Sequence, residues 1–323
     1  MPLSDLPLEQ LQTYRYPRAA PAGLQQFWTD TLAAARAAGG EVTVTPADTG
    51  VTAFDISDLT FPGFAGEPIR AWWTRPKNIT DDLPVVVEYI GYGGGRGLPH
   101  ERMLWAAHGY HHLVVDSRGQ GSIGMVGDTP DPHGSGPAAN GYFTRGIDAP
   151  ENLYYRRLYT DAARAIDAVR TLPGVRADRV AVWGHSQGGG LALAAAALVP
   201  DVTACAARTP FLCGIQRSAQ VSSAGPFVEV VQYQAAHRDL AERAAANLDY
   251  IDVALLAPWI RSPVWVCVAL MDGVCPPSGI YGAINNMTVR PEVVVRPFNG
   301  HEGGGPFDEA DLASWFAARL LAD

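Results

Sequence analysis

The chain has 323 residues and a formal net charge of −9, with 47% hydrophobic and 18% charged residues. This length and composition are ordinary for a globular enzyme with a substantial core. The acidic balance argues against nucleic acid as a partner, because no basic stripe is present to displace counterions from a polyanion. No apolar run is long enough to span a bilayer, and the polar N-terminus lacks the apolar core of a secretory signal, so no membrane partner is expected.

The first part of the chain predicts a helix and then edge strands. Residues 24–38 carry apolar side chains at helical spacing and end at Gly39-Gly40, a helix stop signal. Alternating apolar and polar residues over 50–61 and 68–75 predict antiparallel strands. We therefore expect an N-terminal helical arm over about residues 1–45, followed by strands at the edge of a sheet.

From residue 84 onward, short β-branched runs alternate with helical segments. This alternation is typical of a mostly parallel sheet that helices cover on both faces. The expected strands are residues 84–91, 111–116, 179–184, 263–270 and 292–298, and the expected helices are about 99–108, 151–171, 187–198 and 308–321. The order of these elements predicts an α/β-hydrolase fold.

Two stretches depart from this alternation. Residues 119–147 are rich in Gly, Pro and Asp and are interpreted as a long functional loop. Residues 211–257 have a helical pattern and lie between two expected strands, so we predict a helical insertion that caps the strand ends, before the strand that leads to Asp272. Neither stretch has the character of a linker, so we predict a single domain over residues 1–323.

Gly184-His185-Ser186-Gln187-Gly188 is the one G-x-S-x-G motif in the chain. It directly follows an expected strand and directly precedes an Ala- and Leu-rich helix. A sharp strand-to-helix turn needs glycines for close backbone approach, and it presents the serine above the edge of the sheet. A plain glycine-rich turn with a solvent-facing serine would give the same letters, but the context favours Ser186 as a catalytic nucleophile.

Candidate partners for Ser186 follow it in the order that this fold requires, an acid and then a histidine. Asp272 lies two residues after the strand at 263–270, and His301 lies in a glycine-rich turn after the last expected strand. A serine hydroxyl needs an imidazole to take its proton, and the imidazole needs a carboxylate to fix its tautomer. We therefore assign the catalytic residues as Ser186, Asp272 and His301.

The chain contains other acids and histidines that could take these roles. Asp249, Asp252 and Asp308 are rival acids, but each lies in a helical stretch or at the start of a helix. His111 and His112 begin an expected strand, which favours a structural role.

An acyl-transfer site also needs two backbone N–H donors for the oxyanion. Gln187, the residue after the nucleophile, is the expected first donor. The second is expected in the glycine-rich loop after residues 84–91, and we choose Tyr92 there. A loop that is glycine-rich only to make a turn is the alternative.

Cofactor motifs are absent from the sequence or lack their context. Residues 119–124 match G-x-G-x-x-G, but the prolines and glycines that follow exclude the helix that a dinucleotide site requires. No H-E-x-x-H motif or other metal-ligand spacing is present, so we expect neither a metal nor an organic cofactor. The four cysteines form no C-x-x-C pair and are expected to be free, buried thiols of a reducing compartment.

Three blocks in this order resemble the signature of carbohydrate esterase family 7, which contains acetyl xylan esterases and cephalosporin C deacetylases. The blocks are Arg118-Gly119-Gln120-Gly121, Gly184-His185-Ser186-Gln187-Gly188-Gly189 and His301-Glu302. Further similar segments lie at residues 60–64, 144–147, 154–157 and 271–277, so that the resemblance covers nearly the whole chain.

The resemblance implies an α/β-hydrolase fold with a helical insertion and a catalytic triad of Ser186, Asp272 and His301. It implies oxyanion donors at the amides of Tyr92 and Gln187, with the Tyr92 ring also walling a small acyl pocket. Arg118 and Gln120 would be structural residues near the site. The implied substrates are small acetylated molecules such as xylo-oligosaccharides and cephalosporin C-like esters, and the implied assembly is a cytoplasmic homohexamer.

The predicted function is therefore removal of acetyl groups by an acyl-enzyme mechanism. The same scaffold could also carry a peptidase or a longer-chain esterase or lipase. A non-catalytic binding protein is the remaining alternative, and the complete Ser-Asp-His set disfavours it.

Overall fold

The computed structural model describes residues 5–134 and 136–322. Nine strands form one sheet in the order β1-β2-β3-β5-β4-β8-β9-β10-β11, and β6 and β7 form a separate hairpin. Strands β1, β2, β3 and β5 pair antiparallel, whereas all pairs from β5 to β11 are parallel. The strands are β1 (Thr43–Pro46), β2 (Phe54–Pro62), β3 (Pro68–Pro76), β4 (Leu83–Tyr89), β5 (His111–Val115), β6 (Ser122–Ile123), β7 (Met125–Val126), β8 (Val175–His185), β9 (Ala204–Arg208), β10 (Val264–Ala269) and β11 (Glu292–Arg296).

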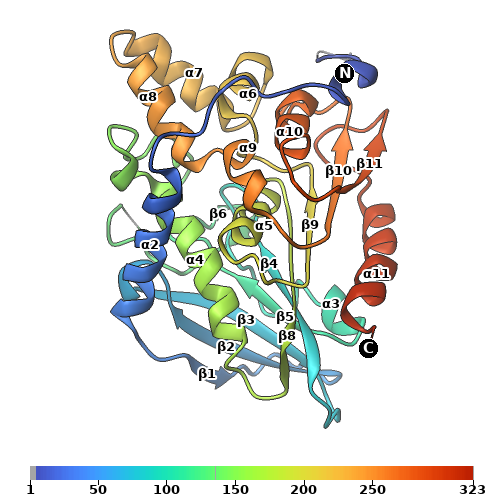
Figure 1. The fold of residues 1–323 in the computed structure, drawn as a ribbon. Coiled ribbons are helices and arrows are strands. Elements are labelled where there is room, and N and C mark those ends of the chain that lie inside the picture. Colours follow the sequence, from blue (N-terminus) through green and yellow to red (C-terminus); the bar gives the residue numbers. More distant parts are fainter. Residues whose placement is uncertain (1–4, 135, 323) are drawn as a thin grey trace.

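Helices cover both faces of this sheet and gather at the carboxyl ends of its parallel strands (Figure 1). They are α1 (Leu8–Leu11), α2 (Leu24–Ala38), α3 (Leu104–Ala107), α4 (Tyr154–Val169), α5 (Gln187–Leu198), α6 (Ile215–Val221), α7 (Phe227–Ala236), α8 (Ala241–Leu248), α9 (Val253–Leu256), α10 (Pro277–Ile284) and α11 (Pro306–Leu320). Short 3₁₀ turns lie at Phe64–Gly66, Pro150–Asn152, Asp249–Ile251 and Ala257–Trp259.

The two faces of the sheet have separate cores because side chains alternate along each strand. Val85 and Val87 of β4 point to the face that α2, α4 and α5 cover. Val86 of the same strand points to the opposite face, where Trp105 of α3 and Phe316 of α11 pack. Continuous apolar runs are therefore required in the central strands, which is the pattern that the sequence carries there.

Helix α5 lies at the centre of the molecule and is apolar on all sides. Its residues from Gln187 to Ala197 are all buried. A helix with no polar face is expected where it is enclosed by protein, and its Gly and Ala side chains allow neighbouring elements to come close. This helix follows the candidate nucleophile directly and fixes the position of the turn.

The predicted α/β-hydrolase fold is confirmed, with differences at particular elements. The helix predicted at 24–38 is α2, and the insertion predicted at 211–257 contains α6, α7, α8 and α9 near the carboxyl ends of the parallel strands (Figure 1). The helix predicted at about 99–108 is only the four residues of α3. Strands β1 and β9 and helix α10 were not predicted.

The long loop at 119–147 contains the β6–β7 hairpin where a dinucleotide site would need a helix. Part of the helical arm expected over residues 1–45 falls on residues 1–4, which lie outside the described residues. The prediction that all these elements form one domain is tested by a single cooperative unfolding transition.

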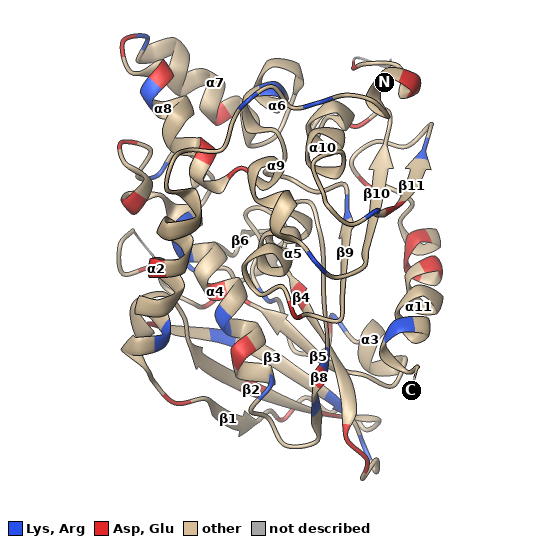
Figure 2. Cartoon of the chain, viewed as in Figure 1, with Lys and Arg blue, Asp and Glu red and all other residues tan. Residues whose placement is uncertain are grey.

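Acidic and basic residues are interspersed along the chain in the view of Figure 2. Many arginines lie in ion pairs, as Arg96 does with Asp58 and Asp128. In the part of the chain that the structure describes, no helix is long and apolar enough to cross a membrane.

Candidate active site

Ser186 lies at the sharp turn between β8 and α5, with φ 57° and ψ −121°. This left-handed conformation is strained for a residue with a side chain. The flanking glycines are required by close contacts: a Cβ on Gly184 would lie 2.2 Å from the Gly188 carbonyl carbon, and one on Gly188 would lie 2.0 Å from the Tyr89 oxygen. The turn therefore holds the Ser186 hydroxyl above the carboxyl end of β8.

His301 lies in the loop between β11 and α11 and contacts both other members of the predicted set. Its Nε2 lies 2.9 Å from Ser186 Oγ, and its Nδ1 lies 2.8 Å from Asp272 Oδ2. Its carbonyl oxygen accepts hydrogen bonds from Thr209 Oγ1 at 3.1 Å and from His185 Nε2 at 2.7 Å. The imidazole is thus positioned through its ring and through its backbone.

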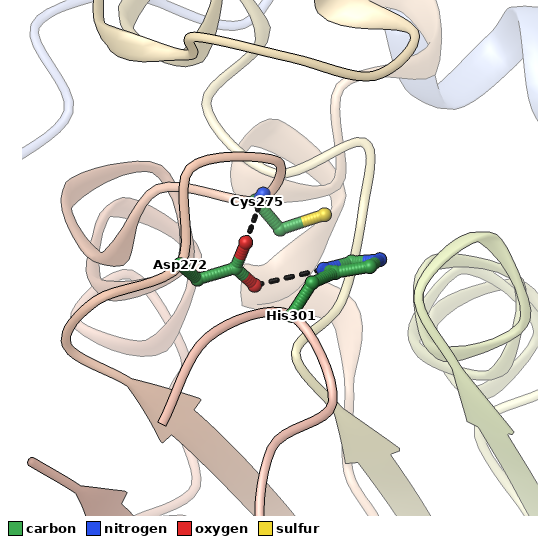
Figure 3. Close-up of side chains that lie close together, drawn as sticks. All are labelled: Asp272, Cys275 and His301. Carbon is green, nitrogen blue, oxygen red and sulfur yellow. Dashed lines mark hydrogen bonds and ion pairs between the residues drawn. The ribbon is translucent and has the colours of Figure 1, made fainter. Parts of the chain in front are cut away.

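Asp272 follows β10 and is buried. Its Oδ1 accepts hydrogen bonds from the backbone N–H groups of Val274 at 2.8 Å and Cys275 at 3.0 Å. Its Oδ2 faces the imidazole of His301, as Figure 3 shows. A carboxylate anchored in this way fixes Nδ1–H as the donor of His301 and leaves Nε2 to accept a proton from Ser186.

His185 is a supporting residue that the sequence did not single out. Burial, with His301 adding to it, lowers the pKa of His185 to about 4, so its ring is neutral at physiological pH. Its Nε2 therefore carries the proton that it donates to the His301 carbonyl. The sequence could have indicated this residue only by its position directly before Ser186, and that position of the G-x-S-x-G motif accepts any residue.

The two predicted oxyanion donors lie on adjacent loops. The Gln187 side chain donates from Nε2 to the carbonyl of Ile90 at 3.1 Å, and this bond ties the start of α5 to the loop that carries Tyr92. Within the described residues, neither the Gln187 amide nor the Tyr92 amide has an acceptor. Both amides are therefore free to donate to a bound group.

Gln120 reinforces this connection from the long loop. Its Oε1 accepts from the Gly93 amide at 2.6 Å, and its Nε2 donates to Gln187 Oε1 at 3.0 Å and to Tyr154 Oη at 2.9 Å. Tyr155 Oη also donates to Gln187 Oε1, at 2.8 Å. This buried network determines how the loop after β4 lies against the turn that carries Ser186.

Arg118 contacts the scaffold below this network. Its Nε and one terminal nitrogen donate to Asp161 at 2.6 Å and 2.8 Å, and its other terminal nitrogen pairs with Glu67. Burial lowers the pKa of the Arg118 guanidinium, but the nearby carboxylates of Asp161 and Glu67 have the larger combined effect, and the net pKa is raised. Neither Arg118 nor Gln120 is hydrogen-bonded to Ser186 or His301 in the described residues, and their structural role stays a prediction.

The Tyr92 side chain is held by the helical insertion. Its hydroxyl donates to Glu229 Oε1 at 2.7 Å and accepts from the Tyr142 amide at 2.8 Å. Its ring packs edge-on against Tyr142 and Phe211, with ring centroids 5.3 Å and 6.1 Å away. Glu229 lies on α7, and no sequence pattern singled it out, because a carboxylate on a helix face is usually solvated.

The rival residues have other partners. Asp249 pairs with Arg18, and Asp308 pairs with Arg296. Asp252 caps α9 through the Ala254 amide at 2.9 Å. None of these three carboxylates is bonded to His301.

The two candidate histidines of β5 also have other partners. His111 bonds to Trp73 and the Gly174 carbonyl, and His112 bonds to Glu88. Their contacts are structural, as predicted from their place at the start of a strand.

Within the described residues, one group of side chains has the composition and spacing to hold a metal ion. It consists of Asp272, Cys275 and His301, each with one ligand atom within 4.8 Å of the others. Two members of this group, Asp272 and His301, are also the predicted catalytic acid and base.

A Ser-His-Asp hydrogen-bonded chain at the carboxyl ends of a mostly parallel sheet defines the α/β-hydrolase class. Comparison with known proteins narrows this class. The chain belongs to the acetyl xylan esterase family, whose model matches residues 1–319, and this membership makes it a carboxylic ester hydrolase. The family resemblance inferred from the three sequence blocks is therefore confirmed.

Two solved structures are very similar over almost the whole chain. The acetyl xylan esterase of a Paenibacillus species is 35% identical with a TM-score of 0.89, and acetyl xylan esterase 1 of a Thermoanaerobacterium species is 32% identical with a TM-score of 0.88. Each comparison covers 98% of this chain and 100% of the other.

A curated relative extends the same family. An acetyl esterase of Xylanibacter ruminicola is 29% identical over 283 residues, which is 87% of this chain. The chain spans 63% of the length of that relative.

Proposed function

We propose that this protein is a serine esterase that removes acetyl groups from small acetylated carbohydrates such as xylo-oligosaccharides. The single observation that carries the proposal is the hydrogen-bonded chain from Ser186 through His301 to Asp272, with distances of 2.9 Å and 2.8 Å. The names of the similar proteins, acetyl xylan esterases and an acetyl esterase, support acetyl as the acyl group.

In the first half of the reaction, Ser186 Oγ attacks the acetyl carbonyl while His301 Nε2 takes its proton. The amides of Tyr92 and Gln187 hold the oxyanion of the tetrahedral intermediate. Asp272 stabilises the imidazolium that forms. When the intermediate collapses, the carbon–oxygen bond to the alcohol breaks and His301 returns the proton to the leaving oxygen, which leaves Ser186 acetylated.

In the second half, a water molecule takes the place of the alcohol. His301 removes a proton from the water as it attacks the acetyl-enzyme, and the same two amides hold the second oxyanion. Collapse releases acetate and returns the proton to Ser186 Oγ. Apart from the substrate and water, each step uses a group of this chain.

Aromatic packing around Tyr92 supports a short acyl group. The ring lies between Tyr142 and Phe211, and Phe211 is tied to the nucleophile because its amide donates to the Ser186 carbonyl at 2.9 Å. A long acyl chain would have to displace these rings.

The test is hydrolysis of p-nitrophenyl esters from acetate to octanoate by wild type, Ser186→Ala and a matched control, Ser262→Ala. Ser262 is also a buried serine, but its hydroxyl has no partner in the described residues. We expect turnover of acetate and propionate only, loss of at least about 10⁴-fold in Ser186→Ala, and wild-type rates in the control.

Other outcomes would redirect the proposal. A preference for octanoate would favour a longer-chain esterase, and turnover of peptide amides would favour a peptidase. Unchanged activity in Ser186→Ala would overturn the mechanism. If acetate is the preferred acyl group, a comparison of acetylated xylo-oligosaccharides with cephalosporin C as substrates would separate the two deacetylase activities that the family resemblance implies.

We also propose a homohexamer located in the cytoplasm. Large apolar side chains exposed on the chain, such as Ile123 and Val126 of the β6–β7 hairpin, support association. The four free, buried cysteines support a reducing compartment. Light scattering would give six times the chain mass of 34.5 kDa for a hexamer, and the chain mass itself would refute it.

A further inference from the structure

Cys275 places a thiol beside the catalytic groups, and the proposed mechanism does not use it. The residue is buried and lies three positions after Asp272, whose Oδ1 accepts its amide. Its Sγ lies within 4.8 Å of a ring nitrogen of His301, the residue that is hydrogen-bonded to Ser186 Oγ. Figure 3 shows its sulfur directed toward the side of the site that the His301 ring occupies.

We propose that Cys275 Sγ, His301 Nε2 and Ser186 Oγ form a site for a thiophilic divalent metal ion such as Zn²⁺ or Cd²⁺, and that the bound ion switches the esterase off. The inhibition rests on the proposed function, whereas the metal binding does not.

The spacing of the three atoms is close to what one ion needs. Tetrahedral zinc with bonds of about 2.3 Å to sulfur and about 2.0 Å to nitrogen or oxygen holds its ligand atoms about 3.3–3.6 Å apart. His301 Nε2 and Ser186 Oγ are 2.9 Å apart, and one ring nitrogen of His301 lies within 4.8 Å of Cys275 Sγ and of a carboxylate oxygen of Asp272.

The hydrogen bond from His301 Nδ1 to Asp272 supplies the second shell of such a site. A histidine that binds a metal through one ring nitrogen usually donates its other N–H to a carboxylate, which fixes the ring and raises its basicity. Here the carboxylate accepts that bond at 2.8 Å and is itself anchored by the amides of Val274 and Cys275. The groups that orient the catalytic base therefore also preorganise a metal ligand.

The donor set determines which ions fit and what they do. A sulfur, a nitrogen and a hydroxyl oxygen favour Zn²⁺ or Cd²⁺ over Mg²⁺ and Ca²⁺, which prefer oxygen ligands alone. On binding, the thiol releases its proton to solvent and a water molecule fills the fourth position. The ion occupies the lone pair of His301 Nε2 that would accept the Ser186 proton, so the nucleophile is no longer activated.

The experiment titrates the metal-stripped, full-length enzyme with Cd²⁺ alone. Two signals are followed, the ultraviolet charge-transfer band of a cadmium–thiolate bond and the rate of p-nitrophenyl acetate hydrolysis. The variants are Cys275→Ala, Cys275→Ser as a more conservative replacement, and Cys205→Ala as the matched control. Cys205 is a buried thiol in β9 and is not among the residues within the described parts of the chain that group for metal binding.

We expect wild type and Cys205→Ala to bind one Cd²⁺ per chain, to gain the band, and to lose activity that a chelator restores. Both Cys275 variants should lack the band and bind Cd²⁺ at least about 100-fold more weakly. A wild-type enzyme without the band, or Cys275 variants inhibited as strongly as wild type, would overturn the proposal.

The two proposals can fail separately. Blocking Ser186 with a serine-directed phosphonate should prevent the band, since it occupies the same oxygen. A chain that binds Cd²⁺ through Cys275 but hydrolyses no ester would keep the metal site and reject the proposed function. An active esterase without the band would do the reverse.

Discussion

The buried pair of Arg118 and Asp161 gives the sharpest test of how the scaffold holds the site. Two hydrogen bonds of 2.6 Å and 2.8 Å join the side chains, and both are buried. Burial raises the pKa of the Asp161 carboxyl, and the adjacent Arg118 guanidinium offsets part of this effect. Replacing Arg118 with Met removes the charge and leaves the carboxylate with the Phe64 amide at 2.8 Å as its hydrogen-bond donor.

The loss in the free energy of unfolding depends on the state of the Asp161 carboxyl once Arg118 is gone. It can stay charged, at a cost of about 3–5 kcal/mol for an unpaired buried ion, or it can take a proton. Protonation at pH 7 of a carboxyl with an unfolded pKa of about 3.9 costs roughly 1.36 × (7 − 3.9), or about 4 kcal/mol, and at pH 5 about 1.5 kcal/mol.

Arg118→Met should therefore lose about 4 kcal/mol at pH 7 and about 1.5 kcal/mol at pH 5. The sign follows because the raised pKa makes the folded variant bind more protons than the unfolded chain, so its stability falls as the pH rises.

Urea unfolding followed by tryptophan fluorescence at both pH values measures this loss. The double variant Arg118→Met with Asp161→Leu removes both charges and should recover most of the stability that the single variant loses at pH 7. An equal loss at pH 5 and pH 7, or no recovery in the double variant, would show that the ion pair is not the source of the effect.

Three further predictions concern residues around Ser186. Glu229→Ala should lower kcat/KM for acetyl esters about tenfold and widen acyl-chain tolerance, because the Tyr92 hydroxyl loses its acceptor. Adding Tyr92→Phe to this variant should lower kcat/KM little further, and a p-nitrophenyl ester series measures both effects. The pKa of His185 is about 4 in the folded protein and about 6.5 in the unfolded chain, so the unfolded chain takes up the proton at a higher pH. As the pH falls from about 6.5 to 4, the free energy of unfolding should therefore decrease by up to about 3 kcal/mol. His185→Asn should flatten that part of the urea-derived profile, and an unchanged slope would count against this assignment. Gly188→Ala would place its Cβ 2.0 Å from the Tyr89 oxygen and should prevent soluble expression, whereas Gly91→Ala, 4.0 Å from its nearest neighbour, should fold with a melting temperature close to wild type.

The sequence predicted the parallel part of the sheet because its strands must be apolar on both faces. The apolar strand before Gly184 and the Ala- and Leu-rich helix after Ser186 are typical of a buried strand-to-helix turn, so this turn could be predicted. Strand β1 was not predicted because its four residues are exposed and have no buried face to give a pattern. Strand β9 was not predicted because it is rich in Ala, a poor strand former, although all but its last residue are buried.

The candidate catalytic residues could be chosen from chain order, but their supporting contacts could not. Asp272 is preferred over Asp252 because it follows a strand, and among the carboxylates considered in the described residues it is Asp272 that bonds to His301. The bonds from Glu229 to Tyr92 and from Gln120 to Gln187 join residues 137 and 67 positions apart. No local pattern encodes such pairs, because they depend on how the insertion and the long loop fold back over the sheet.

The spacing of Ser186, His301 and Asp272 along the chain has a consequence for folding. The bond between His301 and Ser186 joins residues 115 positions apart, with the helical insertion and the strands β9, β10 and β11 between them. Contacts of such high sequence separation carry a large loop-closure cost and form late. The esterase activity is therefore a reporter of the final stage of refolding, and it should return after the helical circular dichroism signal has recovered.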